Sequence, residues 1–397
     1  MPDLLPLRIA SLIVVAWWLV QAVLLFAVAT FVFDVIHAVL HVFAGSRFRL
    51  LRWLASLHQS HHDFFDTDLR FHDDQIRSNL IKHVVPEYLT QMSVSAAGLL
   101  VFDVAPVVLV MGLLTVLFIG MLWLRGKDAN HVAFETLPAP RGGLWVDNAY
   151  HALHHVYPPT YISSYFRVFD LLFGTGCRLR GRRVALTGAS GAFGEPMRKL
   201  LTAAGARVTP LTFGRDYSYD DYSRLDDVLQ ETDILVLCHG AKGEQAMQAN
   251  CDSFVAIIER FRSLTRERRF PVEVWAVGSE IEFHPTFGVA ALRPYLESKR
   301  AFARHARGYW RDRTFVYRHI VPAAFRSRMG PGLMSGQTAA RTALFFIRRG
   351  FRYVPVTYTG IALLNYFKFL LLPGPPRLVE RRPAPAAAPS AEECARS

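Results

Sequence analysis

The chain has 397 residues, enough for two domains that each bury a core of their own. Its formal net charge at pH 7 is +12, but the basic residues are dispersed and flank apolar segments, which argues against nucleic acid as a partner and favours anionic lipid headgroups. The 4 cysteines show no paired metal or redox spacing, which argues against disulfides and iron–sulfur clusters and is typical of thiols kept reduced in the cytosol.

The first predicted element is an apolar helix near the N-terminus. Residues 9–33 carry no charge. At about 1.5 Å per residue, such a helix exceeds the roughly 30 Å hydrocarbon core of a bilayer. Asp3 precedes Arg8 and bulky residues continue to Phe33, so the segment is expected to be a retained anchor and not a cleaved signal peptide.

A second apolar tract covers residues 84–124. Asp103 and Pro106 interrupt it, which predicts two helices that form a membrane hairpin. Basic residues follow both apolar tracts, namely Arg47, Arg49, Arg52, Arg125 and Lys127. By the positive-inside rule we expect an integral membrane protein whose catalytic domains face the cytoplasm.

Histidines are concentrated in this first half, with eleven of the 15 before residue 156. They form one H-x-x-x-H and two H-x-x-H-H motifs, whose members are His37, His41, His58, His61, His62, His151, His154 and His155. Positions i, i+3 and i+4 share one face of a helix, so each motif directs two or three imidazoles to one point. Eight imidazoles exceed the three or four ligands of a single zinc ion, so the pattern predicts a cage for two metal ions. Nitrogen ligands suit iron, zinc or copper, and they leave the choice of metal open.

Around these motifs, over about residues 30–176, the sequence resembles the fatty acid hydroxylase superfamily, which includes sterol desaturases. The motifs match in order and spacing, as do the segments NHVAFETLP at 130–138 and DNAYHALHHVYPPTYISSYFRVFDLLFGT at 147–175. The resemblance implies two Fe ions that activate O₂ against an unreactive C–H bond of a membrane lipid substrate. Hydroxylation, desaturation and aldehyde cleavage all remain open.

The chain departs from the family between the second and third histidine motifs. Where the family commonly has another H-x-x-x-H motif, this sequence has Lys127 and His131, and we expect His131 to be a metal ligand. His72 and His83 either complete the ligand set or are polar residues near the headgroups. Several nearby polar residues either orient imidazoles or lie in solvated loops, namely Asp73, Asp74, Asp147 and Asn148.

After Gly181 short predicted strands alternate with helices, which indicates a parallel sheet with helices on both faces. The strands are predicted at 184–188, 206–211, 232–240, 272–279 and 314–322, with a helix at 195–204. The expected fold is therefore an α-helical membrane histidine-cage domain followed by an α/β Rossmann-like, doubly wound domain. The expected boundaries are 1–180 and 181–355, then an apolar membrane-associated or lid segment at 356–372, for which a core helix is the alternative, and a disordered tail at 373–397.

The first predicted strand runs directly into the glycine-rich segment TGASGAFG, and a helix follows. Glycines let the backbone turn sharply and approach a pyrophosphate, whose charge the helix N-terminus attracts. The expected nucleotide-binding residues are Thr187, Gly188, Ser190, Gly191, Phe193, Gly194 and Gly240. The second strand ends at Thr212 with no acidic residue for a ribose hydroxyl, and Arg215 lies just beyond. Arg215 favours NADP(H) over NAD(H), unless it is only a solvated loop charge.

The predicted catalytic signal is the motif Tyr295-Leu-Glu-Ser-Lys299, with Ser279 upstream at the end of a strand. On a helix, Lys299 lies beside Tyr295, and its ammonium group is expected to lower the pKa of the phenol. A phenol tuned in this way can exchange a proton with a carbonyl or alcohol oxygen. Ser279 is expected to hold that oxygen.

These features resemble the short-chain dehydrogenase/reductase family over about residues 182–355. The resemblance implies that Asn250 is a fourth catalytic residue, beside Lys299, and that the segment PAAFRSRM at 322–329 is a loop touching the nicotinamide. The chain departs from the family in the spacing of the glycines, in the segment HGA at 239–241 and in a nearly missing third strand.

A histidine-cage half joined to a reductase half resembles bifunctional sterol desaturase/short-chain dehydrogenase proteins and the plant cuticular wax (eceriferum) proteins, which implies an enzyme of lipid biosynthesis. A nicotinamide hydride carries two electrons whereas iron accepts them singly, so we expect two separate reactions and an external one-electron donor of the ferredoxin or cytochrome b5 type. One alternative is that only one half is catalytic and the other is a binding or scaffold module. Another is a non-enzymatic membrane partner protein.

Overall fold

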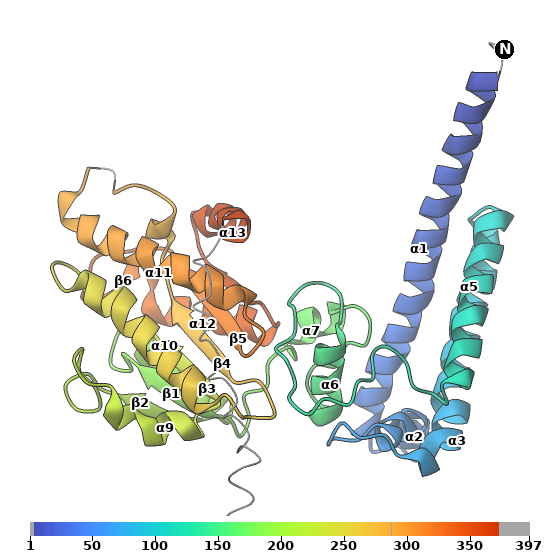
Figure 1. Cartoon of the computed structure of the whole chain (residues 1–397), viewed down its shortest axis with the longest axis horizontal. Helices are drawn as coiled ribbons and strands as arrows, with labels where there is room; N and C mark the ends of the chain where they lie inside the picture. The colour runs from blue at the N-terminus through green and yellow to red at the C-terminus, as the bar shows by residue number, and fades with distance from the viewer. Residues whose placement is uncertain (1–3, 287, 373–397) are drawn as a thin grey trace, which may run out of the picture.

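The computed structural model describes residues 4–372 except residue 287. Figure 1 shows a helical N-terminal half beside an α/β half, which agrees with the predicted fold class. The predicted disordered tail, residues 373–397, lies outside the described residues.

Helix α1 (Leu4–Ala44) is one continuous helix that extends beyond the predicted apolar segment, and this extension carries His37 and His41. Two stretches of the described residues are long and apolar enough to cross a membrane, namely Ser11–Ala44 within α1 and α5 (Val104–Trp123). Large apolar side chains remain exposed along both helices, such as Trp17 at 57% and Leu109 at 53%. Water solvates such a surface poorly.

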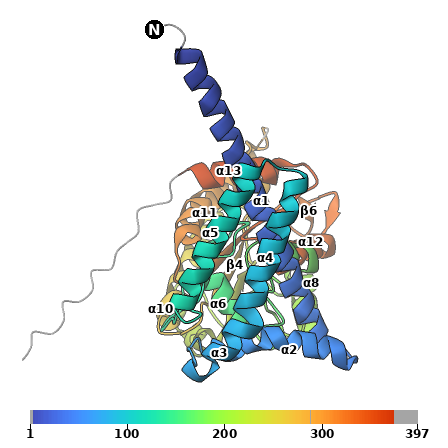
Figure 2. The ribbon, with the colours of Figure 1, turned by 90° about the vertical axis from the view of Figure 1, so that its right-hand side faces the viewer.

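The predicted hairpin consists of α4 (Val85–Ala97), a 3₁₀ turn (Gly98–Leu100) and α5, and it lies against α1 (Figures 1 and 2). Its turn is held by Gln21 of α1. The Gln21 amide nitrogen donates to the Asp103 carboxylate, and the Gln21 amide oxygen accepts from the Asp103 backbone N–H, each at 2.8 Å. Because unpaired polar groups are costly in apolar surroundings, this pair stabilises the turn.

Short helices gather at the end of α1 that carries the histidines. They are α2 (Arg49–Phe64), α3 (Ile76–Asn79), α6 (Asn148–Val156) and α7 (Val168–Phe173), with a 3₁₀ turn (Asp73–Gln75) before α3 and a π-helical turn (Leu80–Val84) after it. Helix α6 begins at Asp147, whose side chain accepts a hydrogen bond from the Tyr150 N–H at 2.8 Å. Both H-x-x-H-H motifs therefore lie on helices, α2 and α6, as predicted.

The sheet of the α/β half has six parallel strands in the order β2-β1-β3-β4-β5-β8. They are β1 (Arg183–Thr187), β2 (Arg207–Leu211), β3 (Ile234–Leu237), β4 (Glu273–Val277), β5 (Val316–Pro322) and β8 (Tyr353–Val356). Five of them were predicted. The sixth, β8, overlaps the start of the stretch read as an apolar segment, and it is fully buried beside β5.

Helices cover both faces of this sheet. Buried residues of α8 (Gly194–Ala203) and α12 (Gly336–Arg348) share one core, while α10 (Ser253–Leu264), α11 (Arg293–Arg311) and α13 (Ile361–Leu371) contribute to the core on the other face. The 3₁₀ turn Ser223–Leu225 and α9 (Asp226–Glu231) precede β3. The remaining short elements are a π-helical turn (Gln248–Asp252), 3₁₀ turns (Glu280–Glu282 and Ala290–Leu292), β6 (Phe325–Arg326) and β7 (Met334–Ser335).

Backbone and arginine contacts join the two halves. The Leu137 N–H donates to the Arg269 carbonyl at 2.8 Å, and the Ala139 N–H donates to the Arg313 carbonyl at 2.8 Å. The buried Arg167 guanidinium, which follows the histidine helices, donates to the Gly350 carbonyl at 3.0 Å. Charge-assisted bonds to buried carbonyls are among the stronger hydrogen bonds, so these contacts hold the halves in register.

Candidate functional sites

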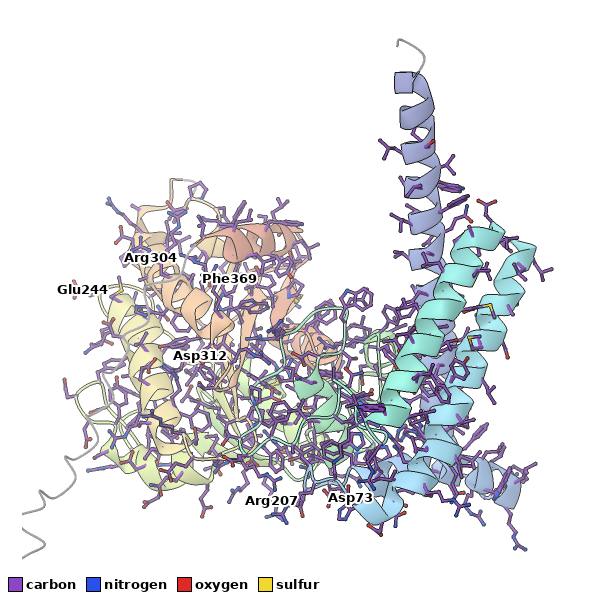
Figure 3. All side chains as sticks on the ribbon, turned by 45° about the vertical axis from the view of Figure 1, so that its right-hand side comes forward. Asp73, Arg207, Glu244, Arg304, Asp312 and Phe369 are labelled. Carbon is purple, nitrogen blue, oxygen red and sulfur yellow. The ribbon has the colours of Figure 1, made fainter. Side chains whose placement is uncertain are left out.

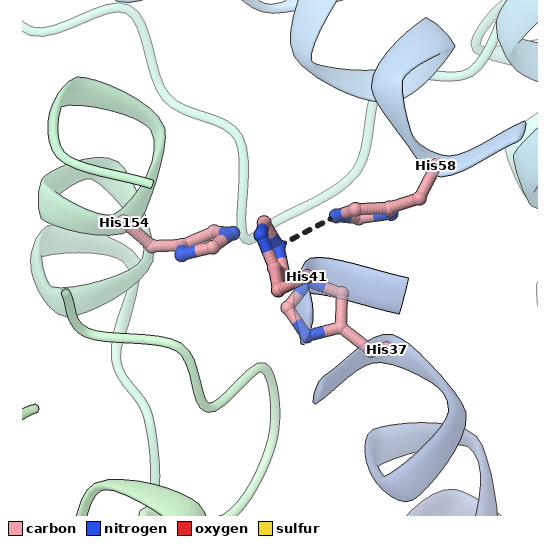
Figure 4. Close-up of side chains that lie close together, drawn as sticks. All are labelled: His37, His41, His58 and His154. Carbon is pink, nitrogen blue, oxygen red and sulfur yellow. Dashed lines mark hydrogen bonds between the residues drawn. The ribbon is translucent and has the colours of Figure 1, made fainter. Parts of the chain in front are cut away.

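The C-terminal end of α1, helix α2, helix α6 and the loop at residue 131 bring nine histidines together. One group of four is His37, His41, His58 and His154, whose candidate ligand nitrogens all lie within 4.8 Å of one another (Figure 4). We call it quartet one. Three separate helices supply its members, and all four are buried or half-buried.

A second group of four is His61, His131, His151 and His155, again with the ligand nitrogens within 4.8 Å of one another. We call it quartet two. All four side chains are buried. The Nε2 atoms of His131 and His61 are 3.0 Å apart, and those of His151 and His131 are 2.9 Å apart. The rings therefore point inward to a common centre.

The nitrogen atoms of both quartets fit metal ions better than hydrogen bonds. A neutral imidazole has one N–H group and one lone pair, yet His58 Nε2 faces both His41 Nε2 at 3.0 Å and His62 Nε2 at 3.1 Å. Both ring nitrogens of His37 and of His154 are buried, and none of the four has a hydrogen-bond partner among the residues that the structure describes. Such atoms cost free energy unless something binds them, and a cation bound by the lone pairs would do so. Four nitrogens per centre suit one transition-metal ion each.

Burial also keeps these imidazoles uncharged. Loss of solvation lowers the pKa of His61, His62, His154 and His155 well below the ordinary value, and it lowers the pKa of His151 to about 3. Neutral imidazole is the form that binds a metal ion. Burial therefore favours the ligating form of these five histidines.

Polar groups around quartet two orient its rings from behind. Asp128 accepts from His131 Nδ1 at 2.7 Å, the Phe65 carbonyl accepts from His155 Nδ1 at 2.7 Å, and the Asn79 amide oxygen lies 3.2 Å from His61 Nδ1. Such partners fix the tautomer, so Nε2 is left to face the metal. Asp128 and Asn79 were missed in the sequence, although the spacing D-x-x-H of Asp128 and His131 was a usable signal.

The polar residues left open as imidazole-orienting or solvated loop residues have other partners. Asp73 is 3.7 Å from Lys127, Asp74 accepts from Gln75, and Asp147 caps α6. Asn148 is the first residue of α6. These side chains lie in turns or at a helix end, where their own backbone or neighbours satisfy them.

Three further histidines differ in their relation to the cage. His62 belongs to neither quartet and lies between them, with its ring centroid 4.9 Å from that of His154 and 4.5 Å from that of His155. His83, which was left open, is buried and stacks on His61 with 3.9 Å between ring centroids. His72 is exposed and pairs with Asp66 outside the cage.

The glycine turn of the α/β half has the shape needed for close approach of a phosphate. Gly188 has a φ of +65°, and a Cβ there would lie 2.7 Å from the backbone nitrogen of His239. A Cβ at Gly194, where α8 begins, would lie 2.1 Å from the Gly188 oxygen. The turn therefore requires glycine, and the N-terminus of α8 lies beside it. This cradle fits the pyrophosphate of a dinucleotide.

The other residues expected to bind the nucleotide lie at the end of β1, in the glycine turn, in the core and near Asn250. Thr187 is buried at the end of β1 and its hydroxyl lies 2.7 Å from His239 Nδ1, while the ring of Phe193 is buried near Phe325 in the core. Ser190 is exposed in the turn beside Gly191. Gly240 passes close to the buried Asn250, since a Cβ there would lie 2.6 Å from its amide oxygen.

Arg215 does not stand alone in the loop after β2. Its guanidinium pairs with Asp216 at 2.8 Å, and Asp216 also accepts from the Thr212 N–H at 2.7 Å. The sequence reasoning overlooked this acidic residue. A carboxylate is the usual partner of a ribose hydroxyl and an arginine that of a 2′-phosphate, so the loop holds a partner for either nucleotide.

The expected catalytic residues meet at the carboxyl end of β4. Ser279 follows β4, and its hydroxyl is close enough to the Tyr295 phenol to oppose the rise in the phenol pKa. Lys299 lies one turn after Tyr295 on α11, with its Nζ 5.9 Å from the phenol ring centroid and 2.8 Å from the Val277 carbonyl oxygen, to which it donates. Asn250 sits in a π-helical turn and donates to the Ala241 carbonyl at 2.8 Å and to the Ser298 hydroxyl at 3.0 Å. Strand ends of this kind are where open α/β sheets bind ligands.

The pKa of Tyr295 corrects one expectation. Burial raises the pKa of this phenol to about 12, the hydrogen bond with Ser279 opposes the increase, and the carboxylate of Glu282 adds to it. Burial also lowers the pKa of Lys299 to about 8. The expected lowering of the phenol pKa by Lys299 is therefore absent, because burial dominates and the Lys299 ammonium is directed to a backbone carbonyl.

Glu282 is a further residue of this site that the sequence reasoning missed. Its carboxylate accepts from the Ser279 N–H at 2.9 Å and lies 3.1 Å from Nε2 of the buried His319. Tyr317 continues the chain of contacts, with its hydroxyl 3.1 Å from His319 Nδ1. The network holds the loop that carries Ser279.

Comparisons with known proteins give the following matches. The chain is 28% identical over 264 residues to a monoglucosyldiacylglycerol epimerase of Synechocystis sp. (strain ATCC 27184 / PCC 6803 / Kazusa), and the match covers 59% of this chain and 62% of that relative. The chain thus spans less than two thirds of the relative's length. No family model matches the chain.

Among solved structures, a short-chain dehydrogenase from Burkholderia cenocepacia J2315 in complex with NADP is similar at 15% identity and a TM-score of 0.39, covering 50% of this chain and 100% of that one. A short-chain dehydrogenase from Sphingobium yanoikuyae in complex with NADPH is similar at 17% identity and a TM-score of 0.37, covering 52% and 98%. An oxidoreductase of the short-chain dehydrogenase/reductase family from Burkholderia thailandensis is similar at 18% identity and a TM-score of 0.38, covering 47% and 97%.

Three features of the α/β half agree with the predicted fold class and site. They are the parallel sheet order, the glycine turn between β1 and α8, and the meeting of Ser279, Tyr295 and Lys299 where β4 ends. The C-terminal half of this chain is a Rossmann-like α/β domain with a parallel sheet, and the N-terminal half is helical and gathers its histidines into two quartets.

Proposed function

We propose that this chain is a membrane-bound lipid oxidoreductase whose C-terminal half interconverts an alcohol and a carbonyl group at Tyr295. The meeting of Ser279, Tyr295 and Lys299 beside the glycine turn carries this proposal. NAD(P) held by that turn supplies the hydride acceptor or donor. The apolar stretches of α1 and α5 support a lipid as the substrate.

Each residue of the site has its own role in the proposed reaction. The Ser279 hydroxyl holds the substrate oxygen, and in the oxidising direction the ionised Tyr295 takes the proton of the alcohol as the carbinol hydrogen leaves with its electron pair. In the reducing direction, the Tyr295 phenol returns a proton to the carbonyl oxygen. Lys299 places a positive charge beside the phenol when it is protonated, and Asn250 holds the segment at Ala241 against α11.

We propose that the two quartets of the N-terminal half hold two metal ions, with iron favoured by the family resemblance. Such a pair supplies O₂-dependent oxidation of an unreactive lipid C–H bond. The chain's own contribution is to keep the imidazoles neutral, to orient them through Asp128 and Asn79, and to exclude bulk water by burial. Electrons for this half come from an external one-electron carrier of the ferredoxin or cytochrome b5 type.

A second candidate reaction for the C-terminal half is epimerisation of a glycolipid headgroup. The observation in its favour is the Synechocystis relative, whose name describes an epimerase of monoglucosyldiacylglycerol. Oxidation of a carbinol carbon at Tyr295, followed by reduction on the opposite face, inverts that carbon without net redox change. The same residues serve both candidate reactions.

A labelling experiment tests the alcohol/carbonyl proposal and separates the two reactions. The detergent-solubilised chain is incubated in one arm with a long-chain aldehyde and stoichiometric 4-deuterated NADPH or NADH. In the other arm it receives monoglucosyldiacylglycerol deuterated at the sugar ring carbons, with a catalytic amount of NADP⁺ or NAD⁺. Deuterium in a new alcohol supports net reduction, and an epimer that keeps its deuterium supports epimerisation. If neither product forms and no nucleotide binds, the proposal for this half is wrong.

The position of Glu282 gives a pH-dependent prediction. Its carboxylate raises the pKa of Tyr295, which is about 12, and alcohol oxidation requires the ionised phenol. The rate should therefore rise with pH toward that value. Glu282→Gln keeps a hydrogen-bond acceptor but removes the charge. We therefore expect the pH at which the rate of alcohol oxidation rises to move down by roughly one pH unit.

The pH profile of alcohol oxidation, recorded from pH 6 to 11, measures this effect. Glu297→Gln is the matched control, because Glu297 is on α11, the helix that carries Tyr295, but is exposed and paired with Arg293. An unchanged profile for Glu282→Gln, or a shift to higher pH, would contradict the electrostatic role of Glu282.

A further inference from the structure

Helix α13 exposes a continuous apolar face next to the Ser279 site. Ala362 and Phe369 are buried against the sheet, where Phe369 stacks on His319 with 4.9 Å between ring centroids. The opposite side carries large apolar side chains that are strongly exposed, namely Leu363 at 53%, Leu364 at 57%, Phe367 at 62% and Leu371 at 81%. Their spacing puts them on one face of the helix, where an apolar patch in water is unfavourable.

A basic stripe runs beside this face. Helix α11 packs against α13 and carries Arg300, Arg304, Arg307 and Arg311 at intervals of four, three and four residues, which places them on one side of the helix. Lys368 of α13 joins them. Burial lowers the pKa of Arg307; the Glu282 carboxylate opposes this, and the charges of Arg304 and Arg311 add to it. Burial also lowers the pKa of Lys368, where the charges of Arg300 and Arg307 add to the effect and Glu282 opposes it. The five cations are therefore close together in space.

We propose that the apolar face of α13 and the basic stripe of α11 form a membrane-contact surface that binds anionic lipid. Apolar side chains bordered by lysine and arginine are the signature of a helix that lies in the interface of an anionic bilayer. The position of α13 agrees with this proposal. In Figures 1 and 2, α13 lies at the upper end of the α/β half, and the N-terminal part of α1 points upward as well. Figure 3 shows Arg304 and Phe369 at this same end.

Hydrogen bonds tie this surface to the loop of the candidate catalytic serine. Glu280 directly follows Ser279, is buried, and accepts from the Thr359 hydroxyl at 2.9 Å and from the Ala362 N–H at 3.0 Å, at the start of α13. Arg311 donates to the Leu370 and Leu372 carbonyls at the other end of α13. The negative Glu280 thus lies at the N-terminal end of α13 and the positive Arg311 at its C-terminal end, and each charge interacts favourably with the helix dipole there. The surface therefore places the loop that carries Ser279 next to the bilayer, so that a lipid alcohol or aldehyde enters without crossing water.

The link to substrate entry rests on the proposed function, but binding to the membrane does not, and the test needs no catalysis. The full chain is placed in nanodiscs of phosphatidylcholine, with or without phosphatidylglycerol, and an environment-sensitive fluorophore is attached at Leu364→Cys. Doxyl-labelled lipid quenches the fluorophore only if it reaches the bilayer. The reference position is Glu231→Cys at the end of α9, a side chain that is 73% exposed, and α9 lies at the opposite end of this half from α13 (Figure 1). The chain without an added cysteine gives the background.

We expect strong quenching at position 364 in discs with phosphatidylglycerol and little at position 231. Arg304→Glu should remove most of the quenching at 364, whereas Lys199→Glu, which reverses an exposed charge on α8, should leave it unchanged. Equal quenching at 364 and 231, quenching at 364 that does not depend on anionic lipid, or a signal that rises with protein concentration in lipid-free detergent would overturn the proposal. The last result would indicate a second copy of the chain as the occupant. Repeating the measurement with Tyr295→Phe separates failure of the surface from failure of the proposed chemistry.

Discussion

Tyr295→Phe is expected to abolish alcohol/carbonyl interconversion while the chain stays folded. The substitution removes one hydroxyl group, which faces Ser279 and is the proton-transferring group of the proposed reaction. General acid–base groups contribute roughly 10²- to 10⁴-fold to a rate, so we expect a fall in kcat of that size with little change in the dissociation constant of the nucleotide. Initial rates with a lipid alcohol and nucleotide binding by titration measure the two effects.

The control for this variant is Tyr88→Phe, which removes a hydroxyl from the apolar hairpin, where it contacts Thr115. It should leave the rate unchanged. Metal content should also be unchanged in Tyr295→Phe, because Tyr295 and the quartets lie in different halves. If kcat of Tyr295→Phe stays within about twofold of the parent, another group transfers the proton and the role proposed for Tyr295 is wrong.

The second large effect concerns the metal cage. We expect the purified chain to contain about two transition-metal ions, one per quartet. His154→Ala removes a member of quartet one and should reduce the content to about one ion, and His151→Ala should do the same through quartet two. Elemental analysis of the detergent-solubilised protein gives the number and the element, and iron is the expected one.

His72→Ala is the matched control for these variants, since His72 is exposed and paired with Asp66 outside the cage. It should keep both ions. Removing the metal with a chelator should lower the melting temperature of the parent, because a ligand that binds only the folded state stabilises it. A parent protein with no metal above the buffer level, or an equal loss of metal in His72→Ala, would contradict the two-quartet cage.

The same variants distinguish a bifunctional enzyme from one with a single active half. If both halves are catalytic, Tyr295→Phe removes the nucleotide-dependent reaction and His154→Ala removes the O₂-dependent one. If only the C-terminal half is active, His154→Ala leaves all activity in place. Strict coupling of NADPH consumption to O₂ consumption without an added carrier would contradict two separate reactions.

Features that depend on local sequence patterns were readable before the structure. The spacing of His58, His61 and His62 on α2, and that of His151, His154 and His155 on α6, was readable because helix geometry relates i, i+3 and i+4. The position of Lys299 one turn after Tyr295 was readable for the same reason, and the glycine turn before α8 was readable because it follows a strand directly and precedes a helix. Strand β8 was not, since a short apolar run beside another apolar stretch looks alike in a strand or a helix.

The division of the histidines into two quartets depends on how the helices pack. His154 joins His37, His41 and His58, whereas its neighbours His151 and His155 on the same helix join His61 and His131. Spacing along one helix shows which imidazoles share a face, but the angles at which α1, α2 and α6 pack decide which faces meet. The same holds for His83 beside His61, for Glu280, which bonds to the start of α13, and for Glu282 beside His319. Each of these contacts joins residues from separate elements, and their distance in space is set by the packing of the whole chain and not by local sequence.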